Sequence, residues 1–202
     1  MTMIKIPFNQ EMIDTASIKA KQMGTLNNSI LKGGGNNSGF LGELALADFL
    51  SARIVSDRSY GHDLEWQNKR IEVKTKRVTT PPLPHYLASV SRLSLEHQRP
   101  DFFVFVRIQF KKKMINPFDK TQFQYFRPKV IWVTGFKNGN DFLSEATLRK
   151  AGEINPNNNF RCVADEYTIP LRDLENYEEF VYKNSQYHTL WNDRELKRHG
   201  FQ

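Results

Sequence analysis

The chain has 202 residues, 39% of them hydrophobic and 12% aromatic, which suits one domain with its own core. Its net charge of +7 favours an anionic partner such as nucleic acid. A single cysteine, Cys162, excludes an intramolecular disulfide and a cysteine-based zinc site. No run approaches the ~18 apolar residues of a membrane helix, and nothing at the N-terminus resembles a signal peptide. We therefore expect a soluble, cytoplasmic protein without membrane association.

The first part of the chain predicts a helix followed by a polar loop. Residues 14–23 have helical character, and residues 27–38 are rich in Gly, Asn and Ser. The loop contains Gly33-Gly34-Gly35 but lacks the Lys-Ser/Thr pair of a phosphate-binding loop, which argues against binding of a nucleoside triphosphate. We expect a surface loop here, with a flap over a binding groove as the alternative.

The next segment, residues 39–50, is apolar almost all round and predicts a buried helix, with Asn37 or Ser38 as its N-cap. Glu43 lies inside this helix, and a buried carboxylate is unfavourable unless it is paired or bound to a metal. Asp48 lies about 140° away around the helix axis, so we expect it to face elsewhere.

The segment that follows predicts a β-hairpin that brings two acids and one lysine together. On its second strand, alternation places Glu72 and Lys74 on one face and Ile71 and Val73 on the other. Asp63, at the start of the first strand, then comes beside Glu72. The two strands are expected at residues 64–66 and 71–76, with the turn at residues 67–70.

These residue types point to a divalent-metal site. Two neighbouring carboxylates repel each other unless a cation lies between them or one of them stays protonated. The oxygens of Asp63 and Glu72 are hard ligands that suit Mg²⁺ or Mn²⁺. Glu43 is the candidate for a third acidic group. Lys74 adds a compact positive charge that can contact a phosphate or an attacking water.

The remainder of the chain predicts more strands and helices. Residues 101–108 are nearly continuously apolar, as expected of a strand at the centre of a sheet that is covered on both faces.

The next segment interleaves basic and aromatic residues, which suits phosphate and base binding or a hairpin whose aromatics face the core. Its residues are Lys111, Lys112, Lys113, Phe118, Phe123, Tyr125 and Phe126. The other expected elements are a break at 79–84, helices at 86–97, 141–150 (capped by Asn140 or Asp141) and 190–199, strands at 129–134 and 167–170, and a loop at 154–160. The strand at 167–170 is expected at a sheet edge, where proline is tolerated. This order predicts an α/β fold with a central mixed β-sheet flanked by helices.

The acidic residues and the lysine together resemble a known family. Glu43 on a first helix, then Asp63, then Glu72-Val73-Lys74 on a strand is similar to the pattern of the PD-(D/E)xK nuclease superfamily, whose members include restriction enzymes, junction resolvases and repair nucleases. The resemblance implies a restriction-endonuclease-like core over about residues 37–135. Residues 136–202 would then be a C-terminal elaboration of the same single domain, 1–202.

The resemblance also implies an activity and a cofactor. It implies metal-dependent hydrolysis of phosphodiester bonds, with DNA as the expected substrate and Mg²⁺ as the metal, for which Mn²⁺ can substitute. Asp63, Glu72 and the backbone carbonyl of Val73 would hold the metal, and Lys74 would act at the scissile phosphate. Glu43 would hold a second metal or orient the attacking water.

Four residues beside these are candidates for contacts with nucleic acid. Lys76 and Arg77 continue the second strand, and Lys76 shares the face of Lys74. A solvated strand end explains Lys76 equally well. Tyr60 and His62 flank Asp63 and are expected to line a substrate groove, and His62 stands where many members of the superfamily have proline.

Several functions stay open at this point. Within the nucleases, the alternative is a structure-selective enzyme for junctions or flaps. Outside the enzymes, the alternatives are a catalytically silent nucleic-acid-binding module of the same fold and a structural basic protein whose acids are merely solvated. Many relatives in the superfamily cut as dimers, so the resemblance also suggests a homodimer.

Overall fold

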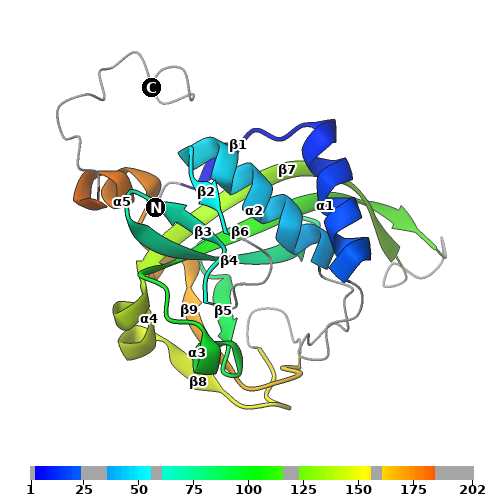
Figure 1. Cartoon of the computed structure of the whole chain (residues 1–202). Coiled ribbons are helices and arrows are strands. Elements are labelled where there is room, and N and C mark those ends of the chain that lie inside the picture. Colours follow the sequence, from blue (N-terminus) through cyan, green and yellow to red (C-terminus); the bar gives the residue numbers. More distant parts are fainter. Residues whose placement is uncertain (1–2, 24–35, 56–60, 116–122, 156–160, 185–202) are drawn as a thin grey trace.

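The computed structural model describes residues 3–23, 36–55, 61–115, 123–155 and 161–184 (Figure 1). Within these ranges the centre of the molecule is a six-stranded sheet in which β4 and β6 are parallel and the other neighbours are antiparallel. The strands lie in the order β1 (Ile4–Ile6), β7 (Phe123–Asn138), β6 (Phe102–Met114), β4 (Lys69–Val78), β3 (Leu64–Trp66) and β2 (Arg53–Ile54). The predicted α/β fold with a central mixed sheet and flanking helices is confirmed.

Two helices cover one face of this sheet. α2 (Asn36–Leu50) packs on β4, and α1 (Gln10–Met23) packs against α2 (Figure 1). The larger core lies between α2 and the sheet, where the side chains of α2 and of the strands are buried together. Both helices were predicted, and both begin earlier than expected.

The predicted caps of α2 are wrong, because Asn37 and Ser38 lie inside the helix. The amide of Asn37 donates a hydrogen bond to Ser17 Oγ of α1 at 3.0 Å. Asn37 therefore joins the two helices instead of ending one of them, a contact between distant segments that a capping pattern does not reveal. Asp48 is exposed, as expected.

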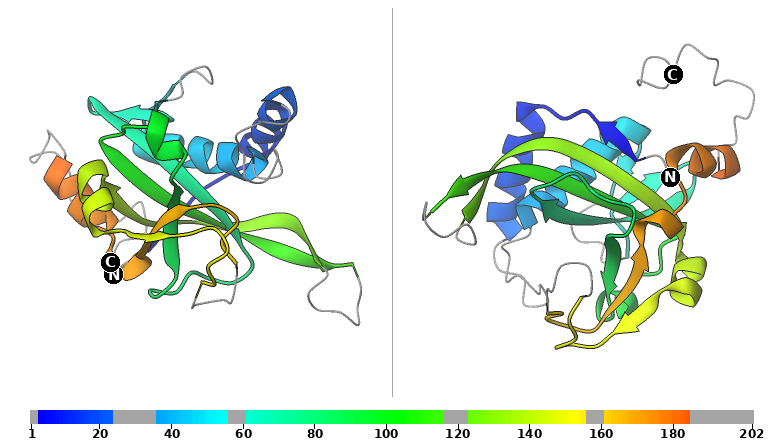
Figure 2. Two further views of the ribbon diagram at one scale, coloured as in Figure 1. Left: turned by 90° about the horizontal axis from the view of Figure 1, so that it is seen from below. Right: turned by 180° about the vertical axis from the view of Figure 1, so that it is seen from behind.

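A smaller sheet covers the opposite face (Figure 2). Its antiparallel strands lie in the order β5 (Leu87–Ser91), β9 (Glu166–Pro170) and β8 (Thr147–Arg149). Together with α4 (Gly139–Glu145) they enclose a second core around Phe103, Phe105 and Phe142. The alternate residues of β6 thus enter two different cores, which is why this strand reads as continuously apolar.

The expected helix at residues 86–97 is wrong. The segment forms β5 and then the single-turn helix α3 (Ser94–His97). Leu87 pairs with Pro170 and Ser91 with Glu166, so a strand far along the chain supplies the backbone partners. Only long-range pairing distinguishes this strand from a helix.

The C-terminal predictions are partly wrong. α4 ends at Glu145, not at residue 150. Its N-cap is Asn138, whose side-chain oxygen accepts hydrogen bonds from the backbone N–H groups of Asn140 and Asp141. β8 follows because residues 147–149 pair with β9. β9 is the middle strand of its sheet, not an edge strand, and Pro170 is its last residue, where a missing N–H disturbs the ladder least.

The helix α5 (Tyr177–Asn184) closes one end of the larger core (Figure 1). Phe180 stacks on Phe136 with 4.0 Å between ring centroids, and on Trp66 with 5.2 Å. A short 3₁₀ turn, Leu171–Asp173, precedes it. The expected helix at 190–199 and most of the expected loop at 27–38 lie outside the described residues. No helix within the described ranges is both long and apolar enough to cross a membrane.

The ends of β6 and β7 extend beyond the rest of the sheet as a hairpin arm (Figure 2). We define the arm as residues 111–115 and 123–129. Its basic residues are exposed: Lys111, Lys112, Lys113, Arg127 and Lys129. Phe126 is 65% exposed and Tyr125 37% exposed, so these two aromatics do not face a core.

Candidate active site

The hairpin formed by β3 and β4 positions the predicted acids. Its turn is two residues long, not four, because Trp66 pairs with Lys69. Gln67 and Asn68 in the turn have φ values of 48° and 62°, the left-handed conformation that matches the twist of a tight hairpin. Leu64 pairs with Ile71, so Asp63 follows next to Glu72 in register.

Asp63 is tied to β4 by two hydrogen bonds. Its backbone N–H donates to the Ile71 carbonyl at 2.9 Å, and its carboxylate oxygen Oδ2 accepts from the Val73 N–H at 2.7 Å. β3 begins only at Leu64, so the carboxylate takes the place of a strand partner for Val73. The side chain is therefore held against β4, as the hairpin pattern predicted.

Glu72 and Lys74 share one face of β4, and Ile71 and Val73 the other, as predicted. Ile71 and Val73 are buried in the larger core beneath α2. On the opposite face, Lys74 Nζ donates to Glu72 Oε1 at 2.7 Å and to Gln98 Oε1 at 2.9 Å. Gln98, which follows α3, was not singled out from the sequence, because only the folding of the α3 segment onto β4 brings it to Lys74.

One oxygen of Glu72 has no partner within the described part of the chain. The residue is 3% exposed, and its Oε2 is buried without a hydrogen bond. An ionised carboxylate presents about four acceptor positions, and a buried one that is incompletely bonded is unfavourable. Glu72 Oε2 is therefore available to a ligand that Lys74 does not supply.

Glu43 approaches the acids because α2 lies very close to β4. A Cβ atom at Gly42 would clash with Thr75 Oγ1 and would lie 3.2 Å from Thr75 Cβ. Glycine at this position allows the close approach, and the next residue, Glu43, acts electrostatically on Asp63. The structure thus brings Glu43 into the range of the hairpin acids.

A substitution tests this close approach. We expect Gly42→Ala to destabilise the protein by up to about 2 kcal/mol, because overpacking costs ~1–3 kcal/mol and the gain in helix propensity is about 1 kcal/mol. Urea unfolding measures the difference. Gly39→Ala is the matched control, since a Cβ there would have Glu43 Oε1 at 3.9 Å as its nearest neighbour. Equal stabilities for the two variants would contradict the packing argument.

The electrostatics of Asp63 reflect this crowding of acids. Burial, followed by the charges of Glu72 and Glu43, raises the pKa of Asp63 well above its ordinary value. The Val73 N–H and the charge of Lys74 act in the opposite direction but do not balance these effects. A divalent cation would relieve the repulsion, because it favours the ionised form of each acid.

The raised pKa has a consequence for stability in the absence of metal. The folded state holds the Asp63 proton at pH values where the unfolded chain, with a pKa near ~3.9, has lost it, so stability falls as pH rises through this interval. In EDTA at pH 7 we expect Asp63→Asn to be more stable than wild type by about 1–3 kcal/mol. Asparagine keeps an oxygen that can accept from the Val73 N–H. Urea unfolding between pH 4 and pH 8 should show the advantage shrinking towards low pH. An asparagine variant that is less stable at every pH would refute the expectation.

The residues present fit a divalent cation, although they do not form a closed cage. Asp63, Glu72 and Glu43 supply carboxylate oxygens, the hard donors that Mg²⁺ and Mn²⁺ prefer, and Glu72 Oε2 is unbonded. Among the described residues, no three Asp, Glu, His or Cys side chains are gathered closely enough to form a ready metal-binding group. Lys74 occupies the other oxygen of Glu72.

The remaining predicted site residues have other surroundings. His62 Nε2 lies 3.2 Å from Glu65 Oε1, and Glu65 is also paired with Arg53. The guanidinium of Arg77 lies over the ring of Tyr125 in the arm, 4.7 Å from its centroid. The roles of Lys76, Arg77 and His62 in nucleic-acid binding stay predictions, and Tyr60 lies outside the described residues.

Comparison of the chain with protein-family models and with curated proteins gives no match. The chemistry of the site is therefore inferred from its own residues.

Proposed function

We propose that the protein is a metal-dependent nuclease that hydrolyses phosphodiester bonds, with DNA as its substrate. The observation that carries this proposal is the group of charged side chains on the β3–β4 hairpin. Within the described residues, the buried carboxylate of Glu72 has one oxygen without a hydrogen bond, and the Asp63 carboxylate lies beside it. The Lys74 ammonium donates to the other oxygen of Glu72. Charge repulsion among the acids supports a role beyond structure, because it opposes folding unless a cation binds.

Each residue has a task in this reaction. Asp63, Glu72 and the Val73 carbonyl would hold Mg²⁺ or Mn²⁺, which when bound polarises the phosphoryl oxygen and lowers the pKa of its water. Lys74 places a positive charge where negative charge develops on the phosphate. Gln98 would keep a hydrogen-bond acceptor on the Lys74 ammonium if a cation took up the Glu72 carboxylate. Glu43 would orient the attacking water or hold a second metal.

The hairpin arm supports nucleic acid as the substrate. Its exposed lysines and arginine form a positive surface that suits phosphates, and net charge of the whole chain is +7. Exposed aromatics beside cations suit base stacking, and Lys113 Nζ lies 5.8 Å from the centroid of the Phe126 ring. Of the two readings of this segment, the exposure of Tyr125 and Phe126 favours the binding surface over core-facing aromatics.

The experiment that tests the function is a cleavage panel. Wild type and Asp63→Asn are incubated with supercoiled plasmid, linear duplex, single-stranded DNA, RNA and a four-way junction, each with Mg²⁺, Mn²⁺ or EDTA. We expect cutting by wild type with either metal, none in EDTA, and loss of cutting in Asp63→Asn.

The panel also separates the alternatives. Cutting confined to the junction would identify a structure-selective nuclease. Binding without cutting of any substrate in either metal would identify a silent nucleic-acid-binding module. Cleavage that persists in Asp63→Asn or in EDTA would show that the hairpin acids are not the active site.

A further inference from the structure

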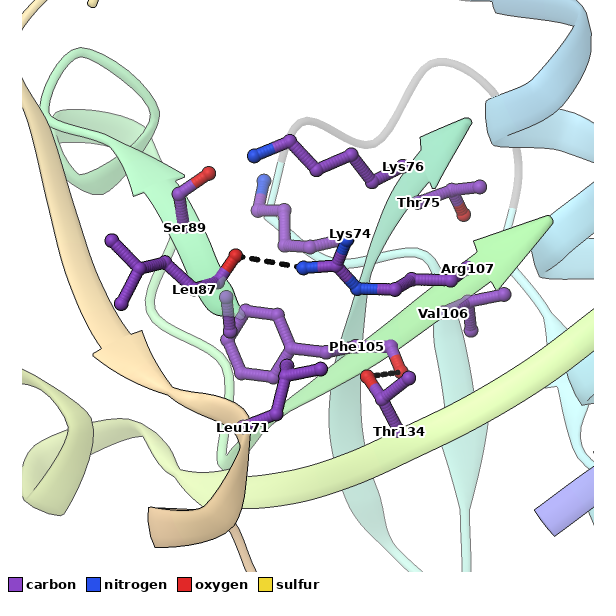
Figure 3. A pocket seen from close by; sticks show the side chains of 11 residues that line it. Lys74, Thr75, Lys76, Leu87, Ser89, Phe105, Val106, Arg107, Thr134 and Leu171 are labelled. Carbon is purple, nitrogen blue, oxygen red and sulfur yellow. Dashed lines mark hydrogen bonds between the residues drawn. The ribbon is translucent and has the colours of Figure 1, made fainter. Parts of the chain in front are cut away.

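A cavity of about 140 Å³ lies beside Lys74, between the central sheet and β5. This is many times the ~10–15 Å³ that one water requires, so the cavity can take a polyatomic anion. Its walls include Lys74 and Lys76 of β4, Arg107 and Phe105 of β6, and Ser89 of β5 (Figure 3). Figure 3 shows both lysine side chains extending from β4 towards Ser89, with the Arg107 guanidinium near Leu87. Lys74 lines this cavity and is also a residue of the candidate active site, so the two adjoin each other.

A local irregularity in the sheet accompanies this cavity. The register of β6 and β7 shifts between Phe105 and Val106, which leaves Thr134 as an extra residue in β7. Thr134 lines the cavity and donates from its hydroxyl to the Phe105 carbonyl at 2.9 Å. Such bulges are common beside functional sites, where they redirect a strand.

Two positive charges are held side by side in this wall. Lys76 and Arg107 are register partners on the parallel strands β4 and β6, so their side chains leave the sheet on the same face. Arg107 is 6% exposed, and its pKa is lowered to about 10 by burial, so it stays charged at neutral pH. Lys76 is exposed overall, and partial desolvation of its side chain, followed by the charge of Arg107, lowers its pKa. The two cations repel each other, and an anion bound between them would relieve this repulsion.

The protein itself supplies little counter-charge for these two cations. Arg107 donates to the Leu87 carbonyl at 2.9 Å and lies 5.6 Å from the centroid of the Tyr86 ring. The carboxylate of Glu166 attracts Lys76 electrostatically. Within the described residues, however, neither Lys76 nor Arg107 has a carboxylate at ion-pair distance. In the part of the chain that the structure describes, the Arg107 guanidinium thus meets a carbonyl and an aromatic ring, which leaves its charge available to a phosphate, a group that guanidinium binds well.

We infer that this cavity binds a second phosphate group of the nucleic-acid strand, next to the one that is cleaved, through Lys76, Arg107 and the Ser89 hydroxyl. The inference rests on the proposed nuclease function for the identity of the strand. Lys74 then contacts the scissile phosphate at one side of the cavity, and Lys76, two residues further along β4, contacts its neighbour. A guanidinium and an ammonium together match the charge of a phosphate group, whether terminal or within the strand.

Binding is measured without cleavage, in the Asp63→Asn background and in EDTA. The probes are one single-stranded octanucleotide with a 5′-phosphate and the same strand with a 5′-hydroxyl, and inorganic phosphate is the competitor. We expect Lys76→Met and Arg107→Met to weaken binding about tenfold each. Lys69→Met, on the same strand but at the turn, is the matched control and should bind as the parent does.

The two strands identify which phosphate the cavity holds. A 5′-phosphate preference that disappears in Lys76→Met identifies a terminal phosphate as the occupant. Equal weakening for both strands identifies an internal one. Unchanged binding in both variants overturns the inference.

A second measurement avoids the risk that Arg107→Met fails to fold. Wild-type protein in EDTA is acetylated with a small reagent, with and without the octanucleotide, and modification is read by mass spectrometry. We expect Lys76 to be protected relative to Lys69. Equal reactivity of Lys76 with and without the strand overturns the inference.

The two proposals can fail separately. If wild type cleaves in the panel and Lys76→Met keeps the same KM and affinity, the proposed phosphate site in the cavity is wrong and the nuclease function stands. If the protein cuts nothing but its binding of the strand depends on Lys76, the nuclease function is wrong and the phosphate site stands.

Discussion

Replacing Glu72 by Gln should reduce metal-dependent cleavage by at least about 10³-fold, the scale of losing several kcal/mol of metal-assisted stabilisation. Glu72 is 3% exposed and has one unbonded oxygen, so its charge is the strongest candidate to hold a cation. Glutamine keeps the shape and leaves an oxygen for Lys74 Nζ, but it removes the negative charge. Initial rates at several Mg²⁺ concentrations measure the effect, and binding of Mn²⁺ by calorimetry should weaken in parallel.

The control for this substitution is a second Glu–Lys pair with a similar distance between the charged groups, although the Glu145 side chain is 49% exposed and that of Glu72 4%. Glu145 Oε2 lies 2.8 Å from Lys137 Nζ, close to the 2.7 Å between Glu72 Oε1 and Lys74 Nζ. Glu145→Gln removes an ion pair outside the hairpin and should leave the rate unchanged. If both variants lose activity to the same extent, general destabilisation explains the loss and Glu72 has no special role.

Replacing Lys74 by Met should lower kcat by about 10²–10³-fold, the range for losing one preorganised group that stabilises charge in the transition state. Methionine fills similar space, but it leaves the buried Glu72 carboxylate without its ammonium partner, so urea unfolding of the variant is measured beside its rate. Lys74→Arg should rescue poorly, because a planar guanidinium cannot replace a compact ammonium between Glu72 and Gln98.

The matched control is Lys137→Met, which removes the ammonium of a lysine whose side chain is 9% exposed, in the other Glu–Lys pair. Single-turnover cleavage with saturating DNA distinguishes a chemical role of Lys74 from weaker binding. A Lys74→Met variant that cuts as fast as wild type under these conditions would exclude Lys74 from the reaction.

Local pattern was enough to predict much of the hairpin. Two-residue alternation placed Glu72 and Lys74 on one face of a strand and Ile71 and Val73 on the other, and both assignments are confirmed. This works because the direction of a strand side chain depends only on its position in the strand. The nearly uniform apolar character of residues 39–50 likewise predicted a buried helix, since burial follows from composition.

Long-range pairing decided what local pattern could not. The segment at 86–97 has no local signal that separates strand from helix, and only the ladder with β9 makes Leu87–Ser91 a strand. The contact of Gln98 with Lys74 depends in the same way on how the α3 segment folds onto β4. Arg107 was not singled out from the sequence, and its place beside Lys76 became evident only from the parallel pairing of β4 and β6.

The sequence by itself determined which chemical groups the protein offers: two hairpin acids, a lysine on the same face as one of them, and an acid in an apolar helix. The tertiary structure decided which of these groups meet. Glycine at position 42 lets α2 approach Thr75 of β4, and this brings Glu43 within electrostatic range of Asp63. The physical reason is that periodicity and turn chemistry are encoded in neighbouring residues, whereas the approach of a helix to a strand depends on the packing of faces that are distant in the sequence.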